Sequence, residues 1–129
     1  MSQEKAVVRT GSAPAPFQGA PYSQAITANE FVFVSGQLGL KPGEAEIGGG
    51  IAEQTEQVFA NLRAILEEAG TTLDRLVKTT VFLTDLGDFS AMNDVYAGHV
   101  GSSPPARSTV EVAALPSGAL VEIEAIALA

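Results

Sequence analysis

The chain has no cysteine, no tryptophan and a single histidine among its 129 residues. Without cysteine it has no disulfide, no thiolate nucleophile and no cysteine-ligated metal. One histidine is too few for the usual zinc sites, so the residue inventory indicates no metal centre. Most familiar catalytic sets are therefore excluded before any motif is considered.

Basic side chains are also scarce. Seven lysines and arginines stand against fifteen acidic residues, which gives a formal net charge of −8. The basic residues are scattered and no two are adjacent: Lys5, Arg9, Lys41, Arg63, Arg75, Lys78 and Arg107. Nucleic-acid binding draws much of its affinity from clustered lysine and arginine, so we expect no extended RNA-binding groove. A single arginine is still enough to bind one small anion.

Long apolar runs are missing too. No window approaches the length of a membrane span, and the segment 1–14 lacks the apolar core of a signal peptide. We therefore expect no membrane association and, in the absence of any address, a cytoplasmic location. The length fits one domain over residues 1–129.

The chain does contain a regular succession of strand-like and helix-like segments. Helical spacing of apolar residues predicts helices over 51–69 and 89–100, with Gly70 stopping the first and Asp88 capping the second. Runs of β-branched and aromatic residues predict strands at 5–10, 31–38, 75–85, 107–115 and 119–129, with a further short strand near 23–27.

Two helices among five or six strands predict a two-layer α+β domain with both helices on one face of the sheet. The segment Phe31–Val34 is apolar on both faces. The last strand likewise sets Ile126 and Leu128 on one face and Ile123 on the other. Two helices can cover only one face, and a large exposed apolar sheet is a liability. We therefore expect the other face to be buried against further copies of this chain.

Two local features have both a functional and a plainer interpretation. A serine–histidine–aspartate triad would have to use His99, which lies near a predicted helix end, where a surface or capping histidine is the commoner role. The amides of Gly48–Gly50 precede a helix, where backbone amides can hold an anion. No Walker lysine or spaced dinucleotide glycines accompany them, so we interpret the triplet as a turn.

One predicted strand follows two prolines and begins with a charge. Strand alternation puts Arg107, Thr109 and Glu111 on one face. In the last strand, Glu122 and Glu124 share a face. Arg107 either pairs with one of these carboxylates at a sheet edge or subunit interface, or offers its planar fork to a substrate carboxylate. In the second case a nearby glutamate is free to act as a general base on water. The residues alone leave both interpretations open.

Several segments spread over nearly the whole chain carry a family resemblance. They are "PYSQA" (21–25), "FVSGQL" (33–38), "VKTTVFLTDLGDF" (77–89), "MNDVY" (92–96), "PARSTVEVAALP" (105–116) and "VEIEAIA" (121–127). In this combination and order they resemble the Rid/YjgF family. These are the reactive intermediate deaminases, also known as L-PSP or translation-inhibitor-like proteins.

The resemblance implies a chorismate-mutase-like α+β fold with a mixed sheet, assembled as a homotrimer with the sheets facing inward and clefts between subunits. It implies hydrolysis of reactive 2-imino acids and their enamine tautomers, of the 2-iminobutanoate and 2-iminopropanoate type, to 2-keto acids and ammonia. No metal or other cofactor is implied. The expected partners are the small imino acid and other copies of the chain.

By motif, the resemblance implies that Arg107 holds the substrate carboxylate and that Glu122 positions or deprotonates the attacking water. Thr109 stands where many relatives have a cysteine, and its backbone is implied to contact the imine nitrogen or the water. Imines already hydrolyse in water, so orienting the acceptor carbon and one water is enough for catalysis.

Four further residues are implied to form the pocket. Tyr22 would close it from a neighbouring subunit, while Ser35, Gly36 and Asn93 would shape the cleft. Two of these assignments have a plainer alternative. For Asn93 the alternative is a helix-end or packing role, and for Tyr22 it is that of a packed loop aromatic.

Two departures from the family pattern lie near these residues. Ala20 stands between Gly19 and Pro21, where many relatives have glycine directly before Pro-Tyr, and Pro104 takes the place of an aromatic residue that commonly precedes "PAR". Both put substrate size and preference in question. Two other function classes stay open: a non-catalytic small-carboxylate-binding or regulatory protein, and a ribonuclease or translation inhibitor.

Overall fold

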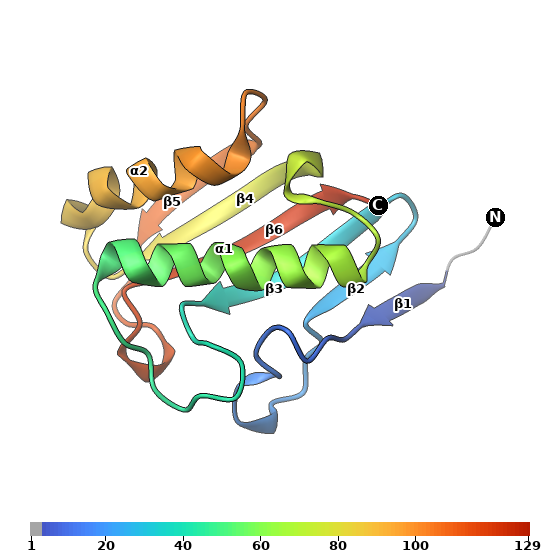
Figure 1. Cartoon of the computed structure of the whole chain (residues 1–129), viewed down its shortest axis with the longest axis horizontal. Coiled ribbons are helices and arrows are strands. Elements are labelled where there is room, and N and C mark those ends of the chain that lie inside the picture. The colour runs from blue at the N-terminus through green and yellow to red at the C-terminus, as the bar shows by residue number, and fades with distance from the viewer. Residues whose placement is uncertain (1–3) are drawn as a thin grey trace.

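The computed structural model describes residues 4–129 as one sheet with two helices (Figure 1). The strands are β1 (Lys5–Val8), β2 (Ala25–Ala28), β3 (Phe31–Leu38), β4 (Leu76–Leu83), β5 (Ala106–Glu111) and β6 (Val121–Leu128). The helices are α1 (Ile51–Glu68) and α2 (Phe89–Val100), and short 3-10 turns are η1 (Phe17–Gly19), η2 (Leu73–Arg75), η3 (Leu86–Asp88) and η4 (Pro116–Gly118). Residues 1–3, the start of the segment expected to lack a signal-peptide core, lie outside the described residues.

The sheet is mixed, with the strand order β1-β2-β3-β6-β4-β5. Neighbouring strands are antiparallel except for β4 and β5, which run parallel because α2 carries the chain back between them. The short strand expected near 23–27 is present as β2. The predicted α+β class, with a mixed sheet and two helices, is therefore confirmed.

Several strands are shorter than expected, and the largest difference is at the end of β5. β5 ends at Glu111 and not at Leu115, so the predicted span 107–115 is wrong at its C-terminal end. Its partner β4 ends at Leu83, which lies across from Glu111. The Leu83 carbonyl accepts a final bond from the Val112 amide at 2.8 Å, and beyond it β5 has no strand to pair with.

The helix ends are set by one glycine and one aspartate. Gly70 has a φ of 87°, a conformation that favours glycine, and it follows the end of α1 as predicted. The predicted cap of α2 is wrong in detail, because the Asp88 side chain makes no capping bond. The Asp85 carboxylate instead accepts from the Gly87 amide at 2.7 Å and so begins η3, which leads directly into α2.

Both helices cover the same face of the sheet, with α1 packed on β3, β6 and α2 (Figure 1). The fully buried apolar residues of α1 are Val58, Phe59, Leu62, Ile65 and Leu66. They pack against fully buried sheet residues that include Val32, Val81, Val121 and Ile123. Two layers thus enclose one core. Among the described residues, neither helix has both the length and the apolar character needed to cross a membrane.

The opposite face of the sheet is apolar and bears no helix. Phe31 and Phe33 are 37% and 43% exposed there, with their ring centroids 6.2 Å apart. The register places Leu128 and Ile126 directly across from them on β6, and Phe82 lies on the same face of β4. We call this surface the open face. Its composition follows the two-sided apolar pattern of the strands, and the expectation that further copies bury it stays a prediction.

Replacing Phe33 with aspartate tests that prediction. Each exposed phenylalanine that becomes buried between copies contributes about 2 kcal/mol, whereas a buried unpaired carboxylate is strongly unfavourable. We expect the native chain to be a multimer in light scattering and Phe33→Asp to lower its mass. Ala52→Asp adds the same charge at an exposed position of α1 and should leave the mass unchanged. A monomeric native chain would contradict the prediction.

Candidate functional site

Arg107 is the second residue of the edge strand β5, and its side chain extends over α2. Its Cζ lies 4.7 Å from the ring centroid of Tyr96 and 5.5 Å from that of Phe89. Within residues 4–129, no carboxylate forms an ion pair with this guanidinium. The arginine is therefore held by aromatic rings, and its N–H groups are not used by a structural salt bridge within the chain.

Asn93 and Thr109 lie on the same side of the sheet as Arg107. Asn93 is one helical turn from both rings, four residues after Phe89 and three before Tyr96, and Thr109 follows Arg107 on the same face of β5. Asn93 Oδ1 and Thr109 Oγ1 are buried without a hydrogen-bond partner in the described part of the chain. Each such atom costs about 1–3 kcal/mol, so both are poised to accept a ligand or a water.

The helix-end alternative for Asn93 is wrong, because this residue lies in the middle of α2 and not at its end. Its position on the stripe that faces β5 agrees with the expectation that it shapes a cleft. That role itself stays a prediction.

Glu122 lies on the other face of the sheet. Its neighbours Val121 and Ile123 are fully buried under the helices, so alternation directs Glu122 to the open face. A Cβ on Gly36 would lie only 2.7 Å from Cδ of Glu122. The β3–β6 register shifts between Val34 and Gln37, and this irregularity together with the missing side chain of Gly36 makes room for the carboxylate.

Burial raises the pKa of Glu122 above its ordinary value of 4.5, and the nearby charge of Glu124 raises it further. The two carboxylates share a face, as the sequence predicts. A carboxyl group whose pKa approaches the working pH is suited to accept and return a proton. The site therefore contains a candidate base on the open face.

Tyr22 lies in the N-terminal loop, and Ser35 lies in β3 next to Gly36, the residue that adjoins Glu122. The Ser35 hydroxyl donates to the Ser23 carbonyl at 2.6 Å, and the Tyr22 hydroxyl accepts from the Phe17 amide at 2.6 Å. Tyr22 and Gly36 line one small cavity of about 40 Å³. The Tyr22 side chain is 44% exposed, so the packed-aromatic alternative is wrong in a single copy of the chain. Tyr22, Ser35 and Gly36 thus gather on the Glu122 side.

Sequence reasoning missed Gln24, which holds this loop in place. Gln24 is 4% exposed. Its amide nitrogen donates to the carbonyls of Thr10, Ala13 and Pro14 at 2.8–3.2 Å, and its amide oxygen accepts from the Thr10 amide at 2.7 Å. The only signal was a glutamine two residues after Tyr22, near the start of a predicted strand. The bonds themselves join residues ten to fourteen positions apart, which no local pattern predicts.

The candidate residues thus form two groups. Arg107, Asn93 and Thr109 lie between β5 and α2, while Glu122 lies on the open face. Their strands are not neighbours, because β4 lies between β6, which bears Glu122, and β5, which bears Arg107. One copy of the chain therefore does not bring the two charged groups together.

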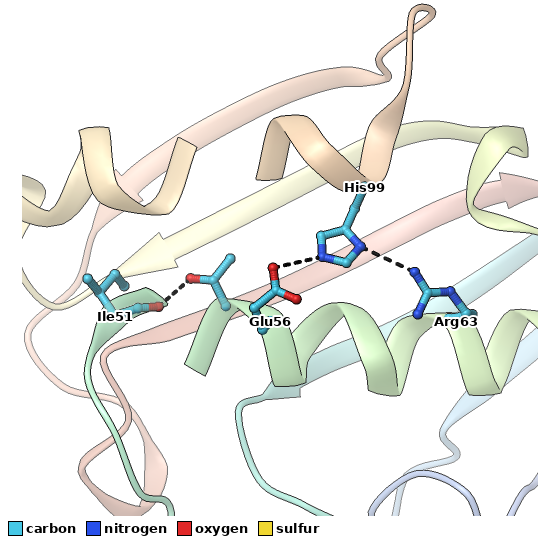
Figure 2. A network of polar contacts seen from close by, with 5 residues as sticks. Ile51, Glu56, Arg63 and His99 are labelled. Atoms are coloured by element: carbon cyan, nitrogen blue, oxygen red, sulfur yellow. Dashed lines mark hydrogen bonds and ion pairs between the residues drawn. The ribbon is translucent and has the colours of Figure 1, made fainter. Parts of the chain in front are cut away.

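The other sequence features have structural partners. His99 stacks on Phe59 with ring centroids 4.5 Å apart, and it bridges the two helices between Arg63 and Glu56 at 3.2 Å each (Figure 2). Because arginine only donates, Nδ1 accepts from Arg63 and Nε2 carries the proton given to Glu56. The Gly50 amide donates to the Glu53 carboxylate at 2.7 Å, so it is not free for an anion. No group of metal-ligating side chains occurs within residues 4–129.

The model of the family "Endoribonuclease L-PSP" matches residues 10–129. The chain belongs to this family, known as Rid/YjgF or L-PSP. It is 52% identical over 124 residues to a RutC family protein of Pyrococcus abyssi, covering 95% of this chain and 96% of that protein. It is 46% identical to the 2-iminobutanoate/2-iminopropanoate deaminase of Bos taurus, covering 95% and 88% of the two chains. The crystal structure of E. coli TdcF with bound serine has a TM-score of 0.88 at 37% identity, covering 96% and 98%.

Within this Rid/YjgF fold, the two departures from the family pattern lie in surface loops. Pro104 is exposed between α2 and β5. Ala20 follows η1, and its carbonyl accepts from the Tyr22 amide at 2.8 Å. Within residues 4–129, neither residue forms a hydrogen bond with Arg107 or Glu122.

The raised pKa of Glu122 predicts how stability depends on pH. Because the folded chain binds this proton more tightly than the unfolded chain, stability should fall as pH rises from about 4.5 through the raised pKa. Glu122→Gln removes this loss. We expect the difference in melting temperature between the variant and the wild type to favour the variant more at pH 7 than at pH 4. Thermal unfolding across that pH range measures this difference. A difference that does not change with pH would contradict the assignment.

Proposed function

We propose that this Rid/YjgF protein hydrolyses 2-imino acids of the 2-iminobutanoate and 2-iminopropanoate type, and their enamine tautomers, to 2-keto acids and ammonia. Relatives that are named for this activity match this chain over nearly its whole length. The observation that most supports the proposal is the state of Arg107. It is partly buried, held by two aromatic rings, and free of any carboxylate partner within residues 4–129.

Arg107 binds the carboxylate of the imino acid in this proposal. A guanidinium presents its donors in a planar fork that matches a carboxylate, and such charge-assisted pairs fix orientation as well as energy. Asn93 Oδ1 and Thr109 Oγ1 lie on the same side and lack partners. They are available to the polar nitrogen of the substrate or to a water beside it.

Glu122 acts as the general base. It removes a proton from a water whose oxygen adds to the carbon of the protonated imine, which gives a neutral carbinolamine. The protonated Glu122 passes that proton to the carbinolamine nitrogen. As the carbon–nitrogen bond breaks, the hydroxyl group gives its proton back to Glu122 and becomes the carbonyl, and the 2-keto acid and ammonia leave. A carboxyl group with a raised pKa suits both steps, because it holds and releases a proton closer to neutral pH.

We infer that the complete site forms between two copies of the chain, with Arg107 from one copy and Glu122 from its neighbour. Within one chain these groups point to opposite faces of the sheet with β4 between their strands. The apolar open face around Glu122 gives a second copy a surface to cover. Tyr22, Ser35 and Gly36 then belong to the Glu122 side, and a trimer of this family closes three such clefts.

The first test generates the imine in place with a threonine dehydratase, and semicarbazide trapping reports how long the imine persists. We expect the native protein to shorten this lifetime. Arg107→Ala should lower kcat/KM by about 100-fold, the loss of roughly 3 kcal/mol expected for two hydrogen bonds to a charged group. Arg75→Ala is a matched control, because this exposed guanidinium forms a hydrogen bond only to the Ala129 carbonyl within residues 4–129.

An unchanged imine lifetime at high protein concentration would refute the deaminase proposal for these substrates. Loss of the multimer in Arg107→Ala, seen by light scattering, would instead assign this residue to the interface.

The second test mixes inactive subunits. Arg107→Ala and Glu122→Gln copies, refolded together in equal amounts, should regain about a quarter of the native activity, since random mixing unites both intact groups in that share of clefts. Arg107→Ala mixed with Asn93→Ala is the control, because both changes lie on one side and no cleft regains every group. Equal rescue in both mixtures, or rescue in neither, would contradict a site shared between copies.

A further inference from the structure

Arg107 lies over two aromatic rings of one helix. Phe89 and Tyr96 are seven residues apart on α2, two turns along the same stripe. Their ring centroids lie 5.5 and 4.7 Å from Cζ of Arg107, both within the range of a cation–π interaction. The first ring is 40% exposed and the second only 5%, so the guanidinium is held between a surface ring and a buried one.

The buried ring is itself fixed from two directions. The Tyr96 hydroxyl shares a hydrogen bond of 2.6 Å with the hydroxyl of Thr79, which is 1% exposed. Thr79 lies directly across from Arg107 in the β4–β5 register. Phe59 of α1 packs against the Tyr96 ring edge-on, with centroids 5.3 Å apart and an interplanar angle of 82°. The ring therefore has one orientation, set by the strand next to Arg107 and by the first helix.

We propose that Phe89 and Tyr96 are positioning residues that hold the Arg107 guanidinium ready for the substrate carboxylate. This inference rests on the proposed function for its consequence in catalysis. An arginine side chain loses substantial rotamer freedom when it is fixed, and that loss weakens ligand binding if it occurs on binding. Ring faces attract the cation without using its N–H donors, whereas a carboxylate partner would occupy them. The two rings thus fix the arginine side chain and leave its N–H donors free.

The first measurement needs no ligand. Nitrogen-15 relaxation of the Arg107 Nε–H group should show a rigid side chain in the native protein and increased picosecond-to-nanosecond motion in Phe89→Leu and Tyr96→Leu. Phe89 is partly exposed, so its replacement does not threaten the fold. A mobile Arg107 in the native protein, or unchanged motion in Phe89→Leu, would overturn the proposal. This result stands whether or not the chain proves to be a deaminase.

The second measurement follows binding of 2-oxobutanoate, the keto acid product, by calorimetry, together with KM and kcat for the imine. We expect the Kd and KM to rise about threefold in Phe89→Leu and about tenfold in Tyr96→Leu, in line with cation–π contacts of increasing burial, with kcat nearly unchanged. Tyr96→Phe keeps the ring and should bind like the native protein.

Two controls separate positioning from packing. Phe59→Leu disturbs the same aromatic cluster without touching Arg107, so it should lower the melting temperature and raise the Kd much less than Tyr96→Leu does. In an Arg107→Ala background, Phe89→Leu should have no further effect on the Kd. If Phe59→Leu weakens binding as much as Tyr96→Leu, or if Phe89→Leu acts equally without Arg107, the rings serve packing and the proposal is wrong.

Discussion

The pairing of β4 between β6 and β5 is the constraint on which the site depends. β4 is antiparallel to β6 and parallel to β5, so the strand that bears Glu122 and the strand that bears Arg107 do not touch. Alternation then directs the two side chains to opposite faces. A single copy contains both halves of the candidate site but does not bring them together. Self-association is therefore part of the chemistry in our proposal, and the apolar open face supplies the driving force for it.

Both charged groups are kept available by surroundings that do not neutralise them. Glu122 lies on an apolar face, where the loss of water raises its pKa and no base pairs with it within residues 4–129. Arg107 lies on aromatic rings that attract its charge and leave its donors unused. A direct pair between the two would satisfy each charge and leave neither for a substrate. The fold separates them by one strand and prevents this pairing within the chain.

Local pattern predicted most of the elements and one face of the candidate site. Apolar spacing located both helices, and alternation placed Arg107 and Thr109 on one face. Both predictions succeed because the order of apolar and polar residues within an element determines which of its sides is buried. Strand order could not be predicted, since β6 enters between β3 and β4 through contacts distant in sequence. The same limit hid the true end of β5 and the bonds of Gln24. Tyr96 lies within the predicted helix 89–100, and its contact with Arg107 became visible only with β5 in place.

Gly36 has a consequence for how this chain can change through descent. Every other amino acid has a Cβ, and at position 36 that atom would collide with the Glu122 carboxylate. A substitution there displaces the proposed base whatever the new side chain is, whereas a shorter residue at position 122 removes the collision. The space that one hydrogen atom leaves at position 36 therefore fixes where the carboxylate of Glu122 lies, so the identity of residue 36 is coupled to the position of the proposed base.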